Sequence, residues 1–218
     1  MSEKKLIVTL DGPAGVGKST IARKLADALG LPYLDTGAMF RGVAWKLGCC
    51  SDLSDEQLEK ELSNIKFTLH GDGESSYLKL NGEALGNEIR TEEVAFAAST
   101  CAQRIAVRKF LKEAQLAIGE RSSLVAEGRD MGTVIFPDAT DKFFLDADIE
   151  ERARRRFLQL RTQGKDADMP ALVEQIKVRD AQDRNRPVAP LIAAEDAIIV
   201  DTTDMNLQEV FESILHEI

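Results

Sequence analysis

Eight residues near the start of the chain have the types and the spacing of a phosphate-binding loop. Gly12, Gly17, Lys18 and Ser19 fit the pattern G-x-x-x-x-G-K-[ST] without a mismatch. Glycines let the backbone curl so that several N–H groups point at phosphate oxygens, while Lys18 reaches the β- and γ-phosphates and the Ser19 hydroxyl holds Mg²⁺. A chance glycine-rich turn is the alternative, but such turns seldom have both flanks correct. The pattern therefore predicts a nucleoside triphosphate site formed by Gly12, Pro13, Ala14, Gly15, Val16, Gly17, Lys18, Ser19 and Thr20.

Arginines are the second group of residues that could do chemistry, because eight of the fifteen arginines lie between positions 152 and 186. Such a run is usually a solvated helix face that pairs with acidic residues one turn away. Like charges on one face repel one another, however, and an arriving anion relieves that repulsion. A transferring phosphoryl group spreads negative charge over its oxygens, and a positive group delivered to it speeds the reaction. We therefore predict that Lys18 and at least two arginines are catalytic, and the candidates are Arg152, Arg155 and Arg156.

The elements that must position these residues alternate between strand and helix, as in an α/β fold. Short apolar runs predict buried parallel strands, and apolar residues at helical spacing follow most of them. The predicted strands cover residues 6–10, 31–35, 124–126, 142–145 and 197–200. Functional residues gather at the carboxyl ends of strands in open α/β sheets, so the loop that begins at residue 127 is a candidate beside the phosphate loop. The sequence therefore predicts a parallel sheet flanked by helices.

The spacing of the apolar residues changes between residues 64 and 90. Apolar and polar residues alternate there, Asp72-Gly73 supplies a turn, and Asn81-Gly82 is a strong signal for a type I′ hairpin. We predict a small antiparallel β insertion that can move as a lobe, and an edge extension of the main sheet is the alternative. The predicted domains are a core of residues 1–63 and 91–218, which includes an arginine-rich helical lid at about 152–170, and an inserted lobe of residues 64–90.

Charge and composition exclude several classes of protein. With 218 residues and a formal net charge of −9, the chain is unsuited to broad binding of nucleic-acid polymers or of anionic membranes. No stretch approaches the ~20 apolar residues of a membrane span, and the first apolar run ends at Asp11, too soon for a signal peptide. Adjacent Cys49 and Cys50 make a poor disulfide, so we predict that these residues and Cys101 are thiols in a reducing cytoplasm. We expect a cytoplasmic monomer.

Several motifs together resemble those of the bacterial cytidylate kinases, which are nucleoside monophosphate kinases. The resemblance covers almost the whole chain, and it is carried by residues 12–20, 35–41, 88–91, 127–134, 179–180 and 183–191. Many families share the glycine-rich loop, whereas the segments around 127–134 and 179–191 are far more specific. The resemblance implies a P-loop kinase fold and direct in-line transfer of the γ-phosphoryl group of ATP to CMP or dCMP. ATP is then the co-substrate and Mg²⁺ the cofactor.

The resemblance also implies which residues hold the phosphate and the sugar of the acceptor. Arg41, Arg129 and Arg186 would clamp the phosphate, because a guanidinium fork matches phosphate geometry. Arg179 and Asp183 would meet the sugar hydroxyls. An acceptor phosphate that is already ionised can react without a protein base, and the sequence does not identify a residue for that role.

The acceptor base and the metal have their own implied residues. Ser99, Arg108 and Asp130 would read the cytosine edge, whose N4 amino group donates to a carboxylate, whereas uracil presents a carbonyl oxygen there. Thr36 would complete the acceptor site. Asp35 would act on Mg²⁺ through a water molecule, beside the direct ligand Ser19.

Rival functions stay open on the residues alone. One rival is another small P-loop kinase, acting on AMP, UMP or a small metabolite such as shikimate. A second is a regulatory P-loop protein without catalysis, but the guanine-reading pattern N-K-x-D is missing. Phe40 stands where the family often has tyrosine, Glu127 where some members have aspartate, and Gln182 where some have a charged residue. An ordinary salt bridge between Asp130 and Arg129 is the alternative to base reading.

Overall fold

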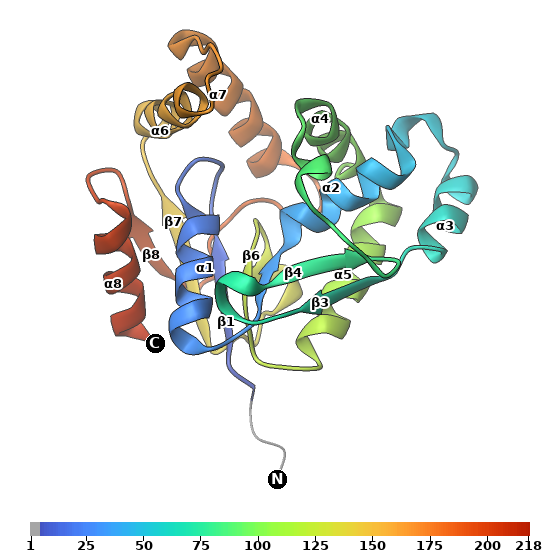
Figure 1. The fold of residues 1–218 in the computed structure, drawn as a ribbon, viewed down its shortest axis with the longest axis horizontal. Coiled ribbons are helices and arrows are strands. Elements are labelled where there is room, and N and C mark those ends of the chain that lie inside the picture. Colours follow the sequence, from blue (N-terminus) through green and yellow to red (C-terminus); the bar gives the residue numbers. More distant parts are fainter. Residues whose placement is uncertain (1–4) are drawn as a thin grey trace.

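A five-stranded parallel sheet lies at the centre of the structure (Figure 1), a computed structural model that describes residues 5–218. The strands run in the order β2 (Tyr33–Asp35), β6 (Leu124–Glu127), β1 (Ile7–Asp11), β7 (Asp141–Asp146) and β8 (Ile198–Asp201). The register places Leu10 of β1 between Glu127 and Phe143. All strands therefore end at one edge, and the predicted parallel sheet is confirmed. Residues 1–4 of the predicted core segment lie outside the described residues.

Helices cover both faces of this sheet and enclose two apolar cores. They are α1 (Lys18–Leu29), α2 (Thr36–Leu47), α3 (Asp55–Ser63), α4 (Glu92–Cys101), α5 (Ile105–Gly119), α6 (Ile149–Thr162), α7 (Met169–Asn185) and α8 (Leu207–Glu217). One core joins α1 and α8 to the sheet through residues such as Leu25 and Val210. The other joins α2, α3 and α5 through residues such as Met39 and Leu111. Each such side chain contributes about 1.5–3 kcal/mol by burial.

Capping side chains set the ends of several helices. Ser54 begins α3 with a capping box, because its hydroxyl accepts from the Gln57 N–H while the Gln57 side chain accepts from the Ser54 N–H. Thr91 accepts from the Val94 N–H and begins α4. The positions of these helices follow from signals that the local sequence carries.

Short turns connect the longer elements. They are 3₁₀ turns over Cys50–Asp52, Gly73–Ser75 and Asn87–Arg90, and one π-helical turn over Met131–Ile135. The π-helical turn follows β6 after residues 128–130 and lies at the carboxyl edge of the sheet.

The insertion forms a sheet of its own. Strands β3 (Phe67–His70), β4 (Tyr77–Leu80) and β5 (Glu83–Ala84) pair antiparallel. Asn81 and Gly82 have φ angles of 50° and 90°, as the type I′ turn predicted for them requires. The three strands pair with no strand of the parallel sheet, so the small antiparallel sheet is confirmed and the edge extension is not what the chain forms. Its movement as a lobe stays a prediction.

Helices α6 and α7 rise above the carboxyl edge of the sheet, on the opposite side of that edge from α2 and α4 (Figure 1). The two helices pack on each other through a small apolar cluster that includes Ala153, Leu172 and Ile176. Gly164 lies in the connection between them, with φ at 71°. The predicted lid region thus contains α6 and the turn into α7.

The cysteines are not all thiols, which corrects the expectation from the sequence. Cys50 and Cys101 form a disulfide across 51 residues, and Cys49 is free. Cys50 lies in the 3₁₀ turn after α2 and Cys101 ends α4, and the packing of α4 on α2 and on that turn brings the two residues together, which their places in the sequence do not reveal. Within residues 5–218, no helix combines the length and the apolar character needed to span a membrane.

Candidate active site

The phosphate-binding loop runs from the end of β1 into the start of α1, as predicted. Gly12 has a φ of 144°, and a Cβ there would lie 2.0 Å from the Leu145 carbonyl oxygen, so no other residue fits. Lys18 is buried, and its Nζ donates to the Pro13 carbonyl oxygen at 2.6 Å. The Ser19 side chain is exposed at the first turn of α1. The loop thus presents a lysine, a hydroxyl and a helix amino end to one point.

Lys18 sits among several charges. Burial lowers the pKa of its ammonium group well below the usual value, and the positive charge of Arg129 lowers it further. The carboxylates of Glu127 and Asp11 act in the opposite direction. A phosphate placed beside Lys18 would favour the ammonium form, so an anionic ligand would relieve an unfavourable burial.

Glu127 ends β6 beside the phosphate-binding loop. The Tyr33 hydroxyl donates to Glu127 Oε1 at 2.5 Å, and the Thr36 hydroxyl donates to the Glu127 carbonyl oxygen at 2.7 Å. Burial raises the pKa of the Glu127 carboxyl and the charge of Asp35 adds to this, whereas Lys18 opposes it. The site residues predicted from the sequence include neither Tyr33 nor Glu127, although the loop that begins at residue 127 is a predicted candidate because it follows a buried strand.

Five arginines share three aspartates at the carboxyl edge of the sheet. Their closest nitrogen–oxygen distances are 3.2 Å for Arg41–Asp35, 3.7 Å for Arg90–Asp35, 3.5 Å for Arg108–Asp130, 3.4 Å for Arg186–Asp130, 2.9 Å for Arg129–Asp183 and 3.8 Å for Arg186–Asp183. We call these eight residues the arginine–aspartate cluster. Its arginines come from α2, the Asn87–Arg90 turn, α5, the loop after β6 and the end of α7. Positive charge exceeds negative charge in the cluster, which suits an anionic ligand.

Three guanidinium groups of this cluster have buried donors that are incompletely satisfied. The Nε of Arg41 has no hydrogen-bond partner within residues 5–218, and the Nη2 atoms of Arg108 and Arg186 face the Asp130 carboxylate at the long distances of 3.5 and 3.4 Å. Buried donors of this kind are usually satisfied by protein, by water or by a ligand. Donors aimed from three elements toward one edge indicate a site for a molecule that carries several acceptor oxygens.

Asp130, which is predicted to read the acceptor base, has two arginines as ion-pair partners. The Asp130 carboxylate sits between Arg108 and Arg186, whereas the ion-pair partner of Arg129 is Asp183, so the simple Asp130–Arg129 salt bridge is not what the structure has. Burial raises the pKa of the Asp130 carboxyl, and the charge of Arg108 opposes this.

Two further predicted contacts and one departure from the family pattern lie around the cluster. Ser99 is exposed on α4, and Arg179 is exposed on α7. Desolvation of its guanidinium lowers the pKa of Arg179, and the charge of Arg129 adds to this, although the residue as a whole is exposed. The Arg108 guanidinium lies over the Phe40 ring, 5.8 Å from its centre. Phe40 therefore contacts the cluster through its ring, where a tyrosine would add a hydroxyl.

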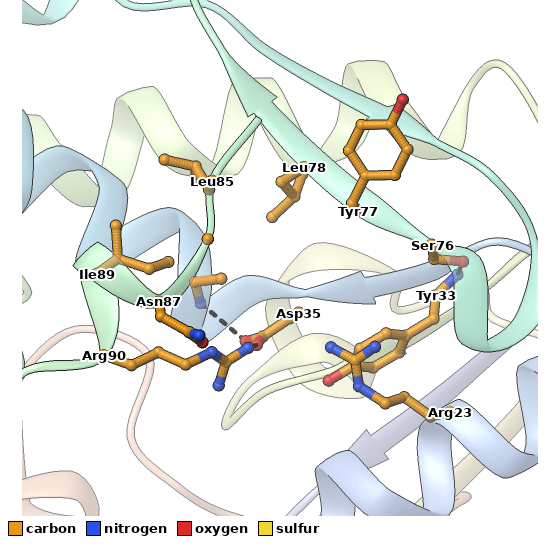
Figure 2. Close-up of a pocket in the computed structure, with 12 residues that line it drawn as sticks. Arg23, Tyr33, Asp35, Ser76, Tyr77, Leu78, Leu85, Asn87, Ile89 and Arg90 are labelled. Atoms are coloured by element: carbon orange, nitrogen blue, oxygen red, sulfur yellow. Dashed lines mark hydrogen bonds and ion pairs between the residues drawn. The ribbon is translucent and has the colours of Figure 1, made fainter. Parts of the chain in front are cut away.

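A pocket opens on the other side of Asp35, between the inserted sheet and α1. Figure 2 shows the Arg90 side chain beside Asp35 and the Arg23 side chain beside Tyr33. The Arg23 guanidinium lies 4.6 Å from the centre of the Tyr33 ring, and Tyr77 of β4 lines the far wall. The pocket has a volume of about 220 Å³. Because Asp35 belongs to both, the pocket is continuous with the arginine–aspartate cluster.

Arg152 of α6 lies at the base of the predicted lid. It is 2% exposed, and its Nη2 contacts Asp180 Oδ2 at 2.6 Å. Its Nη1 donates to the Ala14 carbonyl oxygen of the phosphate-binding loop at 3.3 Å. The structure thus brings Arg152 to the phosphate-binding loop and joins α6 to α7 through the same side chain.

Arg155 and Arg156 point in different directions from Arg152. Arg155 pairs with Glu151 at 2.9 Å and donates to the Thr202 hydroxyl at 3.1 Å. Arg156 pairs with Glu92 at 3.2 Å, which links α6 to α4 across the carboxyl edge. Acidic partners therefore offset the like-charge repulsion expected from the sequence. In this conformation neither guanidinium has an ion pair with the arginine–aspartate cluster.

The residues that could hold a divalent cation are few. Among residues 5–218 no group of three or more His, Cys, Asp or Glu side chains surrounds a common point. Ser19 is close enough to hydrogen-bond to Glu127, and that bond lowers the pKa of the Glu127 carboxyl. Mg²⁺ characteristically takes one or two protein oxygens together with substrate phosphates and water. A hydroxyl beside a buried carboxylate fits such a cation when it arrives with phosphates.

Comparisons with known proteins agree on the type of protein. A family model described as cytidylate kinase matches residues 8–218. Cytidylate kinase from Maridesulfovibrio salexigens is 60% identical over 212 residues, which cover 97% of this chain and 95% of that protein. Cytidylate kinase from Oleidesulfovibrio alaskensis is 56% identical over 214 residues, 98% of each chain. The structure of shikimate kinase from Bacteroides thetaiotaomicron is similar in fold, with a TM-score of 0.50, 12% identity and coverage of 98% of this chain and 96% of that one.

Proposed function

Because the chain belongs to the cytidylate kinase family and phosphorylates CMP and dCMP with ATP, we propose that the arginine–aspartate cluster holds the acceptor nucleotide while the phosphate-binding loop holds ATP. The observation that carries this proposal is the set of buried guanidinium donors on three elements: the Arg41 Nε has no hydrogen-bond partner within the described residues, and the Nη2 atoms of Arg108 and Arg186 lie 3.5 and 3.4 Å from the Asp130 carboxylate. A nucleoside monophosphate offers phosphate, sugar and base acceptors to satisfy them.

The donor side uses the loop from Gly12 to Thr20. The Lys18 ammonium group would leave the Pro13 carbonyl oxygen and bind the β- and γ-phosphates, which the amino end of α1 also favours. Since Lys18 is desolvated in the folded chain, its attraction to phosphate is strong. Its position would then be complementary to the charge that develops on the transferring group.

The acceptor phosphate is proposed to lie between Arg41, Arg129 and Arg186. These residues come from α2, the loop after β6 and the end of α7, so they converge only in the folded chain. A guanidinium presents two parallel donors, which match the oxygens of a phosphate. Asp35 and Asp183 balance the charges of Arg41 and Arg129 in the free protein and would release them in part to the ligand.

The acceptor base and sugar are proposed to contact the other predicted acceptor residues. Asp130 would accept from the cytosine N4 amino group, with Arg108 donating to the same edge and Ser99 beside it. Asp183 and Arg179 would bind the sugar hydroxyls. Exclusion of uracil follows from the same geometry, because a carbonyl oxygen in place of the amino group would face the carboxylate of Asp130.

Catalysis is proposed to rest on Lys18 and on arginines of the lid. Arg152 already reaches the phosphate-binding loop at Ala14, and Arg155 and Arg156 follow on the next turn of α6. Closure of the lid over both nucleotides would exclude water and bring positive charge to the equatorial oxygens. The inserted lobe of residues 64–90 would close from the acceptor side.

Mg²⁺ fits the donor site as the proposed cofactor. Ser19 would bind it directly, and Asp35 would hold one of its water molecules. When bound, the ion neutralises phosphate charge and orients the γ-phosphoryl group for in-line displacement. Glu127 would orient the Ser19 hydroxyl and the water molecules around it.

An acceptor panel tests the function. Mixed with ATP and Mg²⁺, the protein should convert CMP and dCMP faster than UMP or AMP, with ADP formed in equal amount. A rate with AMP or UMP that equals or exceeds the rate with CMP would remove the base-reading role of Asp130. The family membership disfavours the other small P-loop kinases and a regulatory P-loop protein without catalysis. A cytoplasmic location, where nucleotides are made, and a monomeric state belong to the same proposal.

A further inference from the structure

Asp11 is a buried carboxylate that the reaction described above does not use. It is the last residue of β1 and directly precedes Gly12 of the phosphate-binding loop. Its Oδ1 accepts from the Met131 N–H at 2.9 Å, and its Oδ2 accepts from the Gly132 N–H at 2.8 Å. Both carboxylate oxygens are therefore committed to two successive amides of another segment.

The burial of Asp11 is energetically unfavourable in itself. The side chain lies in an environment that raises the pKa of its carboxyl from 3.8 to about 6, because burial outweighs the two amide hydrogen bonds. The charged groups that face it are Asp130, which raises its pKa, and Lys18, which lowers it. At neutral pH the group is still ionised, so it acts as a pure acceptor toward both amides.

The two amides belong to the π-helical turn that begins immediately after Asp130. The Asp130 carbonyl oxygen accepts from Val134 at 2.9 Å, so Asp130 is the residue from which this turn starts. The Asp130 side chain makes no capping bond to the turn. The first N–H groups of any helix lack a partner within the helix, and here Asp11 supplies it from a neighbouring strand. Asp130 is thereby free to face Arg108 and Arg186.

We propose that Asp11 is a positioning residue for recognition of the acceptor base: by holding the N–H groups of Met131 and Gly132 it fixes the turn that aims Asp130 at the acceptor. The inference rests on the proposed role of Asp130 as the reader of cytosine. It also explains why a charged residue stands between the strand and the phosphate-binding loop, where a neutral one would avoid the desolvation. The same strand end then serves the donor through Gly12 and the acceptor through Asp11.

The test compares Asp11→Asn with the unchanged protein. Asparagine keeps the shape of the side chain, but its amide nitrogen cannot accept, so one of the two bonds is lost. Hydrogen bonds to a charged group are among the stronger ones, and we expect the Kd and the KM for CMP to rise about tenfold. Discrimination of CMP against UMP in kcat/KM should fall. The Kd for ATP, measured by calorimetry without an acceptor, should stay within about twofold.

Thr9, which lies two residues before Asp11 on β1, offers a matched control. Thr9 is fully buried in β1, and its hydroxyl has no hydrogen-bond partner within the described residues although it lies near Gly132. Thr9→Val should therefore leave both nucleotide affinities unchanged. If Asp11→Asn weakens ATP as much as CMP, or leaves CMP binding and its discrimination unchanged, Asp11 is not a positioning residue for the acceptor.

Asp130→Ala separates this inference from the proposed function. If Asp130→Ala leaves CMP kinetics unchanged, the base-reading role fails and the role of Asp11 fails with it. If Asp130→Ala impairs CMP use and Asp11→Asn does not, the function stands and the inference is overturned.

Gly132→Ala keeps the inference testable should Asp11→Asn not fold. A Cβ at Gly132 would lie 3.2 Å from the Thr9 hydroxyl and 3.5 Å from Asp11 Oδ2, so it would displace the turn slightly without removing a charge. We expect weaker CMP binding with ATP binding intact. An equal effect on both nucleotides, or none on CMP, would count against the inference in the same way.

Discussion

Arg129 Nε donates a hydrogen bond to Asp183 Oδ2 at 2.9 Å, and this contact joins the loop after β6 to the end of α7. The loop carries residues proposed for the acceptor, and α7 packs on the lid helix α6. If the cluster binds the acceptor as proposed, its occupation would bias the proposed lid through this side-chain contact. In Figure 1, α6 and α7 project together above the carboxyl edge of the sheet.

Asp183→Asn should weaken the acceptor site because Arg129 and Arg186 lose a shared carboxylate. We expect a higher KM for CMP and a smaller change for ATP, measured by steady-state kinetics. Burial raises the pKa of Asp183, but the charge of Arg129 and the hydrogen bond from it outweigh this, so the pKa is lowered overall.

The lowered pKa of Asp183 fixes the sign of its pH effect. Its ionisation contributes stability above its unfolded pKa, near 3.9, and this stability is lost as pH falls through the lower folded pKa. The variant should lose less stability than the unchanged protein below about pH 4. Asp166→Asn is the control, because Asp166 is exposed and its ion pair with the exposed Arg161 is long, at 3.8 Å. Parallel acid denaturation curves for the unchanged protein and Asp183→Asn would contradict the assignment.

Arg186→Ala should reduce kcat/KM for CMP by at least about tenfold, because the variant loses a charged donor that is proposed to bind the acceptor phosphate. Arg184 offers a matched control two residues earlier. It is about half exposed, and it pairs with Asp146 at 3.2 Å, outside the arginine–aspartate cluster. Arg184→Ala should leave the KM for CMP unchanged. Similar losses in the two variants would indicate a general effect of charge at the end of α7.

The disulfide between Cys50 and Cys101 should stabilise the fold. Closure of a loop of 51 residues in the unfolded chain corresponds to about 4 kcal/mol in the chain-entropy view. We expect Cys101→Ser, or reduction of the unchanged protein, to lower the melting temperature by about 10 °C. Cys49→Ser should have little effect, because Cys49 is free. An equal melting temperature with and without reductant would show that the bond contributes nothing.

The local sequence predicted most elements of the fold because the signals act over a few residues. The β1 run, the loop at Gly12 and the Asn81-Gly82 turn each act within a few positions, and the structure has all three. The Cys50–Cys101 bond depends on how α4 packs on α2, which no local pattern contains. The π-helical turn after β6 also has no spacing signal, since its partners lie on β1.

For the site as well, local motifs could be predicted from the sequence, whereas contacts between distant segments could not. The phosphate-binding loop is continuous in sequence, so its residues and their geometry could be predicted from the motif alone. Convergence of Arg41, Arg108 and Arg186 came only from the resemblance to a family, because their spacing carries no period. The Tyr33–Glu127 contact was missed, since it requires the parallel pairing of β2 with β6.

The pH dependence of stability offers a separate check on Asp11. Asp11 is 4% exposed, and burial raises the pKa of its carboxyl from 3.8 to about 6. A group whose carboxyl pKa is higher in the folded state binds its proton more tightly there, so folding gains stability as pH falls from 6 toward 4. A shift of about two units corresponds to about 3 kcal/mol. In urea unfolding between pH 4 and pH 8, Asp11→Asn should lack this part of the slope, whereas Thr9→Val should keep it. Parallel profiles for Asp11→Asn and the unchanged protein would mean that the buried carboxyl titrates at its ordinary pKa.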